Sequence, residues 1–138
     1  MPSMEASAQL RNNPRTNNNA GSPRKARLVA DQIRGLKVDK ALALLKHSPK
    51  AMSPRIERLL LCAVNNWRQK FDLDPADHDL FIKTITADAS KTMKRFTPAP
   101  HGRAHRIRKR THHLTIIVAS ASPLQVEPVT QKEAKAKA

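Results

Sequence analysis

Hydrophobic positions in the first half of the chain recur with the period of an α-helix. The first such stretch follows Ser22 and Pro23, which suit an N-cap and a first helical turn, and it stops before Gly35, which can adopt the left-handed conformation that ends a helix. The pattern predicts a helix over residues 23–34. Its buried stripe would consist of Ala26, Val29, Ala30 and Ile33.

The same spacing continues in two further segments. It predicts a second helix over residues 39–46 and a third helix that extends to Phe71. The third helix has two candidate starts, because Ser48-Pro49 and Ser53-Pro54 each look like a cap followed by a first-turn proline. Its apolar stripe is the widest in the chain and comprises Ile56, Leu59, Leu60, Ala63, Val64, Trp67 and Phe71.

The pattern changes to that of β-strands from Leu80 onward. Residues 80–86 and 114–118 are both rich in β-branched or aromatic side chains. Antiparallel pairing of these runs leaves residues 88–112 beyond the sheet, which is too long for a tight turn. We expect an extended hairpin over about residues 80–118, bent at residues 98–102. The predicted fold class is α+β, with three helices packed on a small antiparallel sheet that carries a long extended β-hairpin.

The two ends of the chain lack this patterning. Residues 1–20 contain five asparagines and few apolar residues, so we expect a flexible N-terminal arm, with a targeting segment as the alternative. Residues 121–138, rich in Ala and Lys, are predicted to be a disordered tail. Residues 21–120 are then a single domain.

Charge points to the kind of partner. The formal net charge is +15 and the pI is about 11.0. No acidic residue occurs between Asp88 and Glu127. Because unopposed like charges destabilise a compact state, we expect a polyanion here, nucleic acid first and an anionic membrane surface second. The acid-free interval contains eight cations: Lys91, Lys94, Arg95, Arg103, Arg106, Arg108, Lys109 and Arg110.

Several other partners and chemistries are disfavoured. The longest apolar run, residues 59–64, is far shorter than the roughly 20 residues that span a bilayer, so no membrane partner is predicted. Cys62, the one cysteine, lies in that run, which fits a reducing cytosol and a small core residue. The few aromatic residues indicate that phosphate contact, rather than stacking of several bases, dominates recognition.

No catalytic or metal chemistry is predicted. The chain has 3 glycines and no phosphate-cradling loop, and no nucleophile, base and acid can be grouped, so we expect neither an enzyme nor a cofactor. Four histidines in the second half lack cysteine partners and the spacing of a zinc site, so no metal is predicted. They are His101, His105, His112 and His113.

Several separate motifs follow one another along the chain. They are SPRKARLVAD from Ser22, IRG from Ile33, KR from Lys94, GRA from Gly102, and RKRT from Arg108 followed by His113 and the apolar strand. In this order they resemble large-subunit ribosomal protein twenty-two in its bacterial form. The resemblance runs from about residue 22 to residue 118, roughly seven tenths of the chain. Three positions depart from the pattern common in that family, namely Ala99, His105 and His112.

The resemblance implies a structural constituent of the large ribosomal subunit. Such a protein would be a cytoplasmic, ribosome-bound monomer that binds 23S-type ribosomal RNA, contacts neighbouring large-subunit proteins and supports assembly. Its hairpin tip would line the nascent-peptide exit tunnel and meet the nascent peptide. The implied RNA-binding residues are Arg24, Lys25, Arg27, Arg34, Lys91, Lys94, Arg95, Arg103, Arg106, Arg108, Lys109, Arg110 and His113. The implied tunnel-lining tip is Met93, Lys94, Arg95, Pro98, Ala99, Pro100, His101 and Gly102.

Three other interpretations remain open from the residues themselves. The chain could be a free architectural DNA-binding protein that uses a basic β-arm with Phe96 or Pro98 as a wedge. The run from residue 91 to 110 could be a solvated polybasic loop. The cations that follow Ser22 could form a merely solvated helix face.

Overall fold

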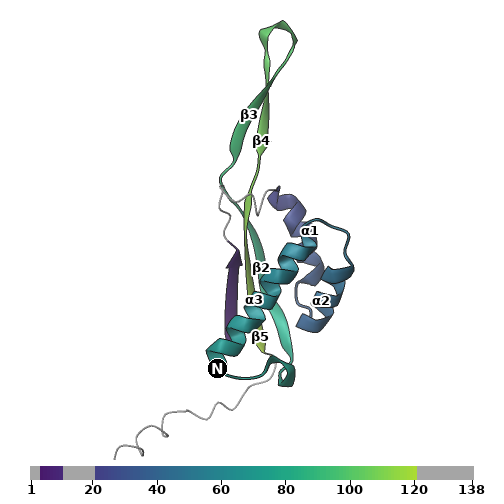
Figure 1. The fold of residues 1–138 in the computed structure, drawn as a ribbon, viewed down its shortest axis with the longest axis vertical. Helices are drawn as coiled ribbons and strands as arrows, with labels where there is room; N and C mark the ends of the chain where they lie inside the picture. Colours follow the sequence, from purple (N-terminus) through teal and green to yellow (C-terminus); the bar gives the residue numbers. More distant parts are fainter. Residues whose placement is uncertain (1–3, 11–20, 121–138) are drawn as a thin grey trace, which may run out of the picture.

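The computed structural model describes residues 4–10 and 21–120 and confirms an α+β fold (Figure 1). The predicted C-terminal tail and the greater part of the predicted N-terminal arm lie outside the described residues. In chain order the elements are β1 (Glu5–Leu10), α1 (Pro23–Ile33), α2 (Val38–His47), α3 (Ser53–Phe71), η1 (Pro75–Asp77), β2 (Leu80–Ala89), β3 (Met93–Pro98), η2 (Pro100–Gly102), β4 (Ala104–Lys109) and β5 (His112–Ser120).

The body of the protein is a layer of helices on one face of a three-stranded sheet. The strand order is β1-β5-β2, and both pairings are antiparallel, which confirms the predicted pairing of the two strand-like runs. Helix α1 packs on β2, α3 packs on β1 and β5, and α2 packs on α3. Ile116 at the centre of β5 lies opposite Ala8 on one side and Ile85 on the other, and all three are buried.

A β-bulge sets which side chains of β2 enter the core. The register shifts between Ile82 and Thr84, so Lys83 is the extra residue. Because of this shift, Ile82 and Ile85 are both buried although they are three positions apart, whereas strict alternation would have put them on opposite faces.

The helix ends mostly follow the predicted signals. Gly35 has φ +76° just after α1, and its N–H donates to the Ile82 carbonyl at 3.1 Å, so the left-handed residue also joins α1 to the sheet. Of the two candidate starts, α3 uses Ser53-Pro54, but Met52 rather than Ser53 occupies the N-cap.

The expectation that Cys62 belongs to the core is wrong. Cys62 is exposed and lines a groove of about 680 Å³ between α3 and β1, together with Arg55 and Arg58. The physical reason is its position on the helix: it lies four residues before Asn66, on the side of α3 that follows the edge of β1, while Ala63 beside it is fully buried.

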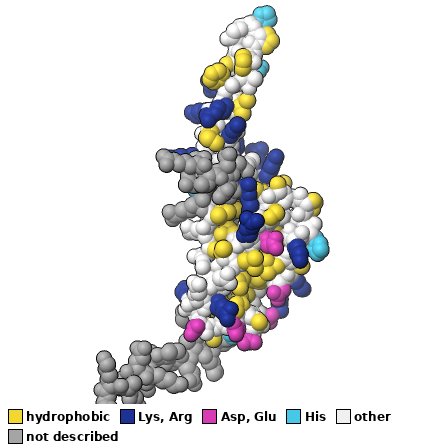
Figure 2. Space-filling view, viewed as in Figure 1, with side chains coloured by type: hydrophobic (Ala, Val, Ile, Leu, Met, Phe, Trp, Pro, Cys, Tyr) yellow, Lys and Arg dark blue, Asp and Glu magenta, His cyan; other side chains and the backbone are white. Residues whose placement is uncertain are grey.

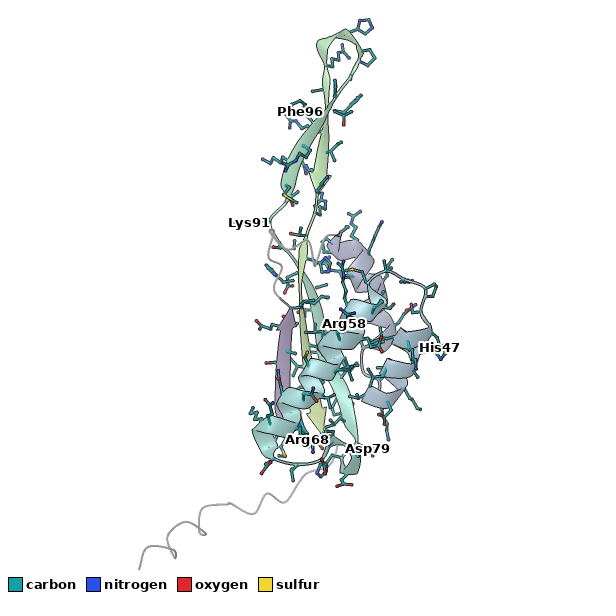
Figure 3. All side chains as sticks on the ribbon, in the orientation of Figure 1. His47, Arg58, Arg68, Asp79, Lys91 and Phe96 are labelled. Carbon is teal, nitrogen blue, oxygen red and sulfur yellow. The ribbon has the colours of Figure 1, made fainter. Side chains whose placement is uncertain are left out.

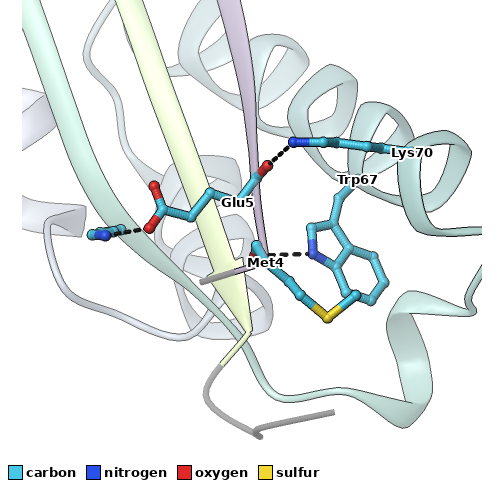
Figure 4. A network of polar contacts seen from close by, with 5 residues as sticks. Met4, Glu5, Trp67 and Lys70 are labelled. Carbon is cyan, nitrogen blue, oxygen red and sulfur yellow. Dashed lines mark hydrogen bonds and ion pairs between the residues drawn. The ribbon is translucent and has the colours of Figure 1, made fainter. Parts of the chain in front are cut away.

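The flexible-arm expectation also differs from the structure over residues 5–10, which form the edge strand β1. Figure 4 shows how α3 holds this strand: Trp67 Nε1 donates to the Met4 carbonyl at 3.4 Å, and Lys70 Nζ donates to the Glu5 carbonyl at 2.9 Å. The Glu5 carboxylate is paired with Lys83 of β2. Small side chains with little hydrophobic signal suffice here because the strand is anchored by backbone pairing and by contacts from α3.

Beyond the body, β3 and β4 form a separate two-stranded sheet that projects from the end of β2 and β5 (Figure 1). Its register runs from Met93 opposite Lys109 to Pro98 opposite Ala104, and the Ala99 N–H donates to the Arg103 carbonyl at 2.8 Å to close the bend. The extended hairpin and the position of its bend are therefore as predicted. His101 (φ 63°) and Gly102 (φ 68°) supply two consecutive left-handed residues that reverse the chain.

Candidate nucleic-acid interface

Lys and Arg side chains gather on the stem of the hairpin and around its junction with the body (Figure 2). All of the hairpin cations are exposed. We call the set the cationic surface; it consists of Arg24, Lys25, Lys91, Lys94, Arg95, Arg103, Arg106, Arg108, Lys109 and Arg110.

The pairing of β3 with β4 places like charges directly opposite each other. Lys94 lies across from Arg108, so their side chains share one face of the hairpin. Like charges in this arrangement destabilise the hairpin when no anion is bound, because the Cβ atoms of directly opposite residues in a sheet are only about 5 Å apart. An anion between or over them would remove this penalty.

The start of α1 extends the cationic surface from the hairpin onto the body. The Gly21 N–H donates to the Arg110 carbonyl at 3.2 Å, which ties the entrance of α1 to the base of β4. Arg24 and Lys25 are exposed in the first turn of α1, which has no acidic residue. Because a helix N-terminus already has positive character, cations there are unfavourable unless an anion is bound.

Two of the predicted RNA-binding residues also contact the protein's own backbone. Arg27 Nε donates to the Ala87 carbonyl at 3.1 Å, and Arg34 Nη2 donates to the Ile85 carbonyl at 3.3 Å. Arg34 also forms an ion pair with Asp31 at 3.0 Å. These two arginines join α1 to β2 and hold Arg24 and Lys25 beside the hairpin base.

The base of the hairpin is fastened by residues that the sequence did not single out for this role. Thr111 Oγ1 donates to the Lys91 carbonyl at 2.6 Å, and the Ser90 N–H donates to the Thr111 carbonyl at 3.0 Å. His112 is fully buried beside them, with Nδ1 3.1 Å from the Gly21 carbonyl. The departure of His112 from the family pattern was the one sequence signal available.

Ion pairs in the described part of the chain avoid the cationic surface. Such pairs join Arg34 to Asp31, Lys37 to Asp79, Arg68 to Asp74 and Lys83 to Glu5. Figure 3 shows Arg68 and Asp79 at the end of the body farthest from Phe96 on the hairpin. Cations near the acidic loop thus have partners within the protein, while those on the hairpin face solvent.

The predicted tip residues fall in two places. The bend contains Pro98, Ala99 and the short turn Pro100–Gly102, with no Lys or Arg. Met93, by contrast, pairs with Lys109 at the opposite end of β3, so it and its neighbours Lys94 and Arg95 lie on the stem. The reason is the length of β3, which separates the KR motif from the bend.

The histidines do not form a common site. His101 is exposed in the bend and His105 is exposed on β4, whereas His112 is buried in the body. His113 is partly buried on β5, opposite Asp88 of β2. Within residues 4–10 and 21–120, no three His, Cys, Asp or Glu side chains come together as metal ligands.

Membrane contact through a spanning helix has no candidate in the described segments. None of α1, α2 or α3 combines the length and apolarity that a bilayer crossing requires.

Comparison of the sequence with known proteins identifies the family. The family described as ribosomal protein L22p/L17e matches residues 14–119. A protein named large ribosomal subunit protein uL22 from Flavobacterium psychrophilum is 50% identical over 110 residues, covering 79% of this chain and 80% of the relative. The protein of that name from Porphyromonas gingivalis is 50% identical over 111 residues (80% of this chain, 78% of the relative), and that from Bacteroides fragilis is 50% identical over 101 residues (73% and 74%). The chain belongs to the ribosomal protein L22p/L17e family.

Proposed function

We propose that this protein is a non-catalytic structural constituent of the large ribosomal subunit that binds 23S-type ribosomal RNA through its cationic surface. Family membership supports its place in the large subunit. The observation that carries RNA binding is the hairpin: an exposed two-stranded arm with eight cations between residues 91 and 110 and no acid. Neutralising backbone phosphates and releasing their counterions would stabilise such an arm.

The stem and the bend of the hairpin differ in charge, which supports a separate role for each. The stem holds most of the cations and binds RNA, while the bend at residues 98–102 contains no Lys, Arg, Asp or Glu. Such a bend suits a passage wall better than phosphate contact. The proposal therefore includes a tip that lines the nascent-peptide exit tunnel and a body that contacts neighbouring large-subunit proteins, with the protein present as a cytoplasmic monomer within each ribosome.

Co-sedimentation tests ribosome binding. The purified chain should sediment with large subunits that lack it and should remain bound through a wash at raised salt, while duplex DNA retains little of it. Retention on duplex DNA with none on the subunit would favour the alternative function, a free architectural DNA-binding protein with a basic β-arm. The alternative rests on the same exposed arm.

Crosslinking tests the position of the tip. A photo-crosslinking residue in place of Ala99 should label a stalled nascent chain in reconstituted subunits. The same residue in place of Leu44, which is exposed on α2, serves as the matched control and should not label it. Equal labelling from both positions would contradict the tunnel assignment.

A further inference from the structure

Phe96 is the most exposed large hydrophobic side chain in the described part of the protein, with 77% of its surface accessible. It lies on β3, directly opposite Arg106 of β4. The ring contacts of the described residues gather around Trp67 in the body, and no cation lies over the Phe96 ring. An aromatic ring held this openly on a strand gains stability only when a partner covers it.

The hairpin register defines what surrounds the ring. Side chains two positions away on the same face are Lys94 and Arg108 toward the body, and Pro98 and Ala104 toward the bend. Phe96 therefore lies between the cations of the stem and the bend at residues 98–102, which contains no Lys or Arg. An apolar protein surface over it would have to desolvate these cations without compensation.

We infer that Phe96 is a stacking platform for one unpaired RNA base, with Arg106, Lys94 and Arg108 holding the phosphates on either side. A nucleotide carries an aromatic base and a negatively charged phosphate a few ångströms apart. This face of the hairpin offers the two matching groups, an exposed aromatic ring and the cations beside it. The base is unpaired because a duplex hides its faces within the stack. This inference rests on the proposed function and adds a base contact to an interface otherwise built on phosphate.

The test uses the full chain and three probes: a single-stranded RNA of about 15 nucleotides, the same RNA as a perfect duplex, and an abasic strand of equal length. Phe96→Leu keeps an apolar side chain but removes the ring. We expect it to weaken binding to the single strand by about 5- to 100-fold, the range for the removal of one base stack. Its salt dependence and its affinity for the abasic strand should stay near those of the unaltered protein.

Two further variants separate stacking from charge and from general apolar contact. Phe96→Trp should retain the affinity, and its emission should change on binding; the natural Trp67 is fully buried and supplies a constant background. Ile107→Ala, on the opposite face of the hairpin and 42% exposed, is the matched control and should bind like the unaltered protein. Arg106→Ala should instead reduce the salt dependence.

The outcomes distinguish this inference from the proposed function. Salt-dependent RNA binding that Phe96→Leu leaves unchanged would overturn the stacking assignment alone. Equal weakening on the single strand and the duplex would replace it with a wedge between paired bases, and Phe96-dependent capture by anionic lipid vesicles with no effect on RNA would assign the ring to a membrane. Absence of any salt-dependent RNA binding would overturn both this inference and the RNA-binding function.

Discussion

At the scale of single residues, exposure separates two kinds of aromatic side chain. Trp67 is fully buried under β1, packs 5.4 Å from the Phe71 ring, and donates to the Met4 carbonyl. Phe96 lies on the hairpin and touches no core. The first stabilises the fold, and the second is free to contribute to binding, since its removal costs the folded state little.

Trp67→Ala should lower the free energy of unfolding by about 3–5 kcal/mol, because a large side chain leaves the core and a cavity remains. Denaturant unfolding followed by circular dichroism would measure it. Phe96→Ala is the control and should change the stability by no more than about 0.5 kcal/mol. Similar decreases from both would show that the hairpin ring is packed in the native state.

At the scale of elements, β1 and the hairpin differ most in how strongly the rest of the protein holds them. Strand β1 is paired with β5 along its full length and is held by α3, so its alanines at positions 6 and 8 are buried. The strands β3 and β4 pair only with each other, and their side chains are almost all exposed. Local stability should therefore fall steeply from the body to the arm.

Ala8→Asp should destabilise the protein by more than about 2 kcal/mol, because it places an unpaired charge in the core. Ser7→Asp is the matched control on the exposed position next to it and should have a small effect. The thermal unfolding of both variants would be compared. If neither variant changed it, residues 5–10 would be a mobile arm in solution after all.

Amide hydrogen exchange should reveal the same gradient. In the free protein, residues 93–109 should exchange much faster than β2 and β5, since no apolar contact protects the hairpin bonds from opening. Addition of RNA should slow exchange in the hairpin. Slow exchange there without RNA would indicate that the arm is rigid by itself.

At the scale of the whole molecule, charge is segregated along the long axis. Four aspartates lie in residues 72–79 at one end of the body, where Arg68 and Lys37 pair with two of them. The acid-free hairpin forms the other end (Figure 2). This distribution orients the protein toward a polyanion with the arm leading.

Arg103→Glu combined with Arg106→Glu should weaken binding to ribosomal RNA and reduce the slope of log affinity against log salt by about 0.7–0.9 for each phosphate that is no longer neutralised. Thermal unfolding should change little, because both arginines are exposed on the arm. Lys40→Glu combined with Lys46→Glu makes the same charge change on α2 and should leave the slope nearly unaltered. Equal decreases in stability and in RNA binding for the hairpin variant would place the arm within the folding core.

Much of the fold could be predicted because its signals are local. Helix α1 begins at Pro23 and ends just before Gly35, as the cap and stop residues indicate, and the bend of the hairpin lies where proline and glycine cluster. The cationic residues of the hairpin are exposed, as an acid-free run requires. Their contacts with RNA remain predictions.

The features that could not be predicted depend on partners distant in the sequence. Strand β1 has little hydrophobic signal and exists through pairing with β5 more than 100 residues later, as Leu10 opposite Leu114 illustrates. Cys62 is exposed because of the side of α3 on which it lies, although its neighbours in sequence are apolar. Arg27 and Arg34 looked equivalent to Arg24 until the structure placed carbonyls of β2 within their reach.

The sequence by itself determined the helices, the two long strands, the bend and the separation of cations from acids, because each depends on spacing and charge along a short stretch of chain. Only the tertiary structure decided that Arg27 and Arg34 bind carbonyls of β2, that Ile82 and Ile85 are both buried on either side of the bulge at Lys83, and that Phe96 remains uncovered. These depend on what packs against each side chain, and such contacts exist only once the sheet and its helices have assembled.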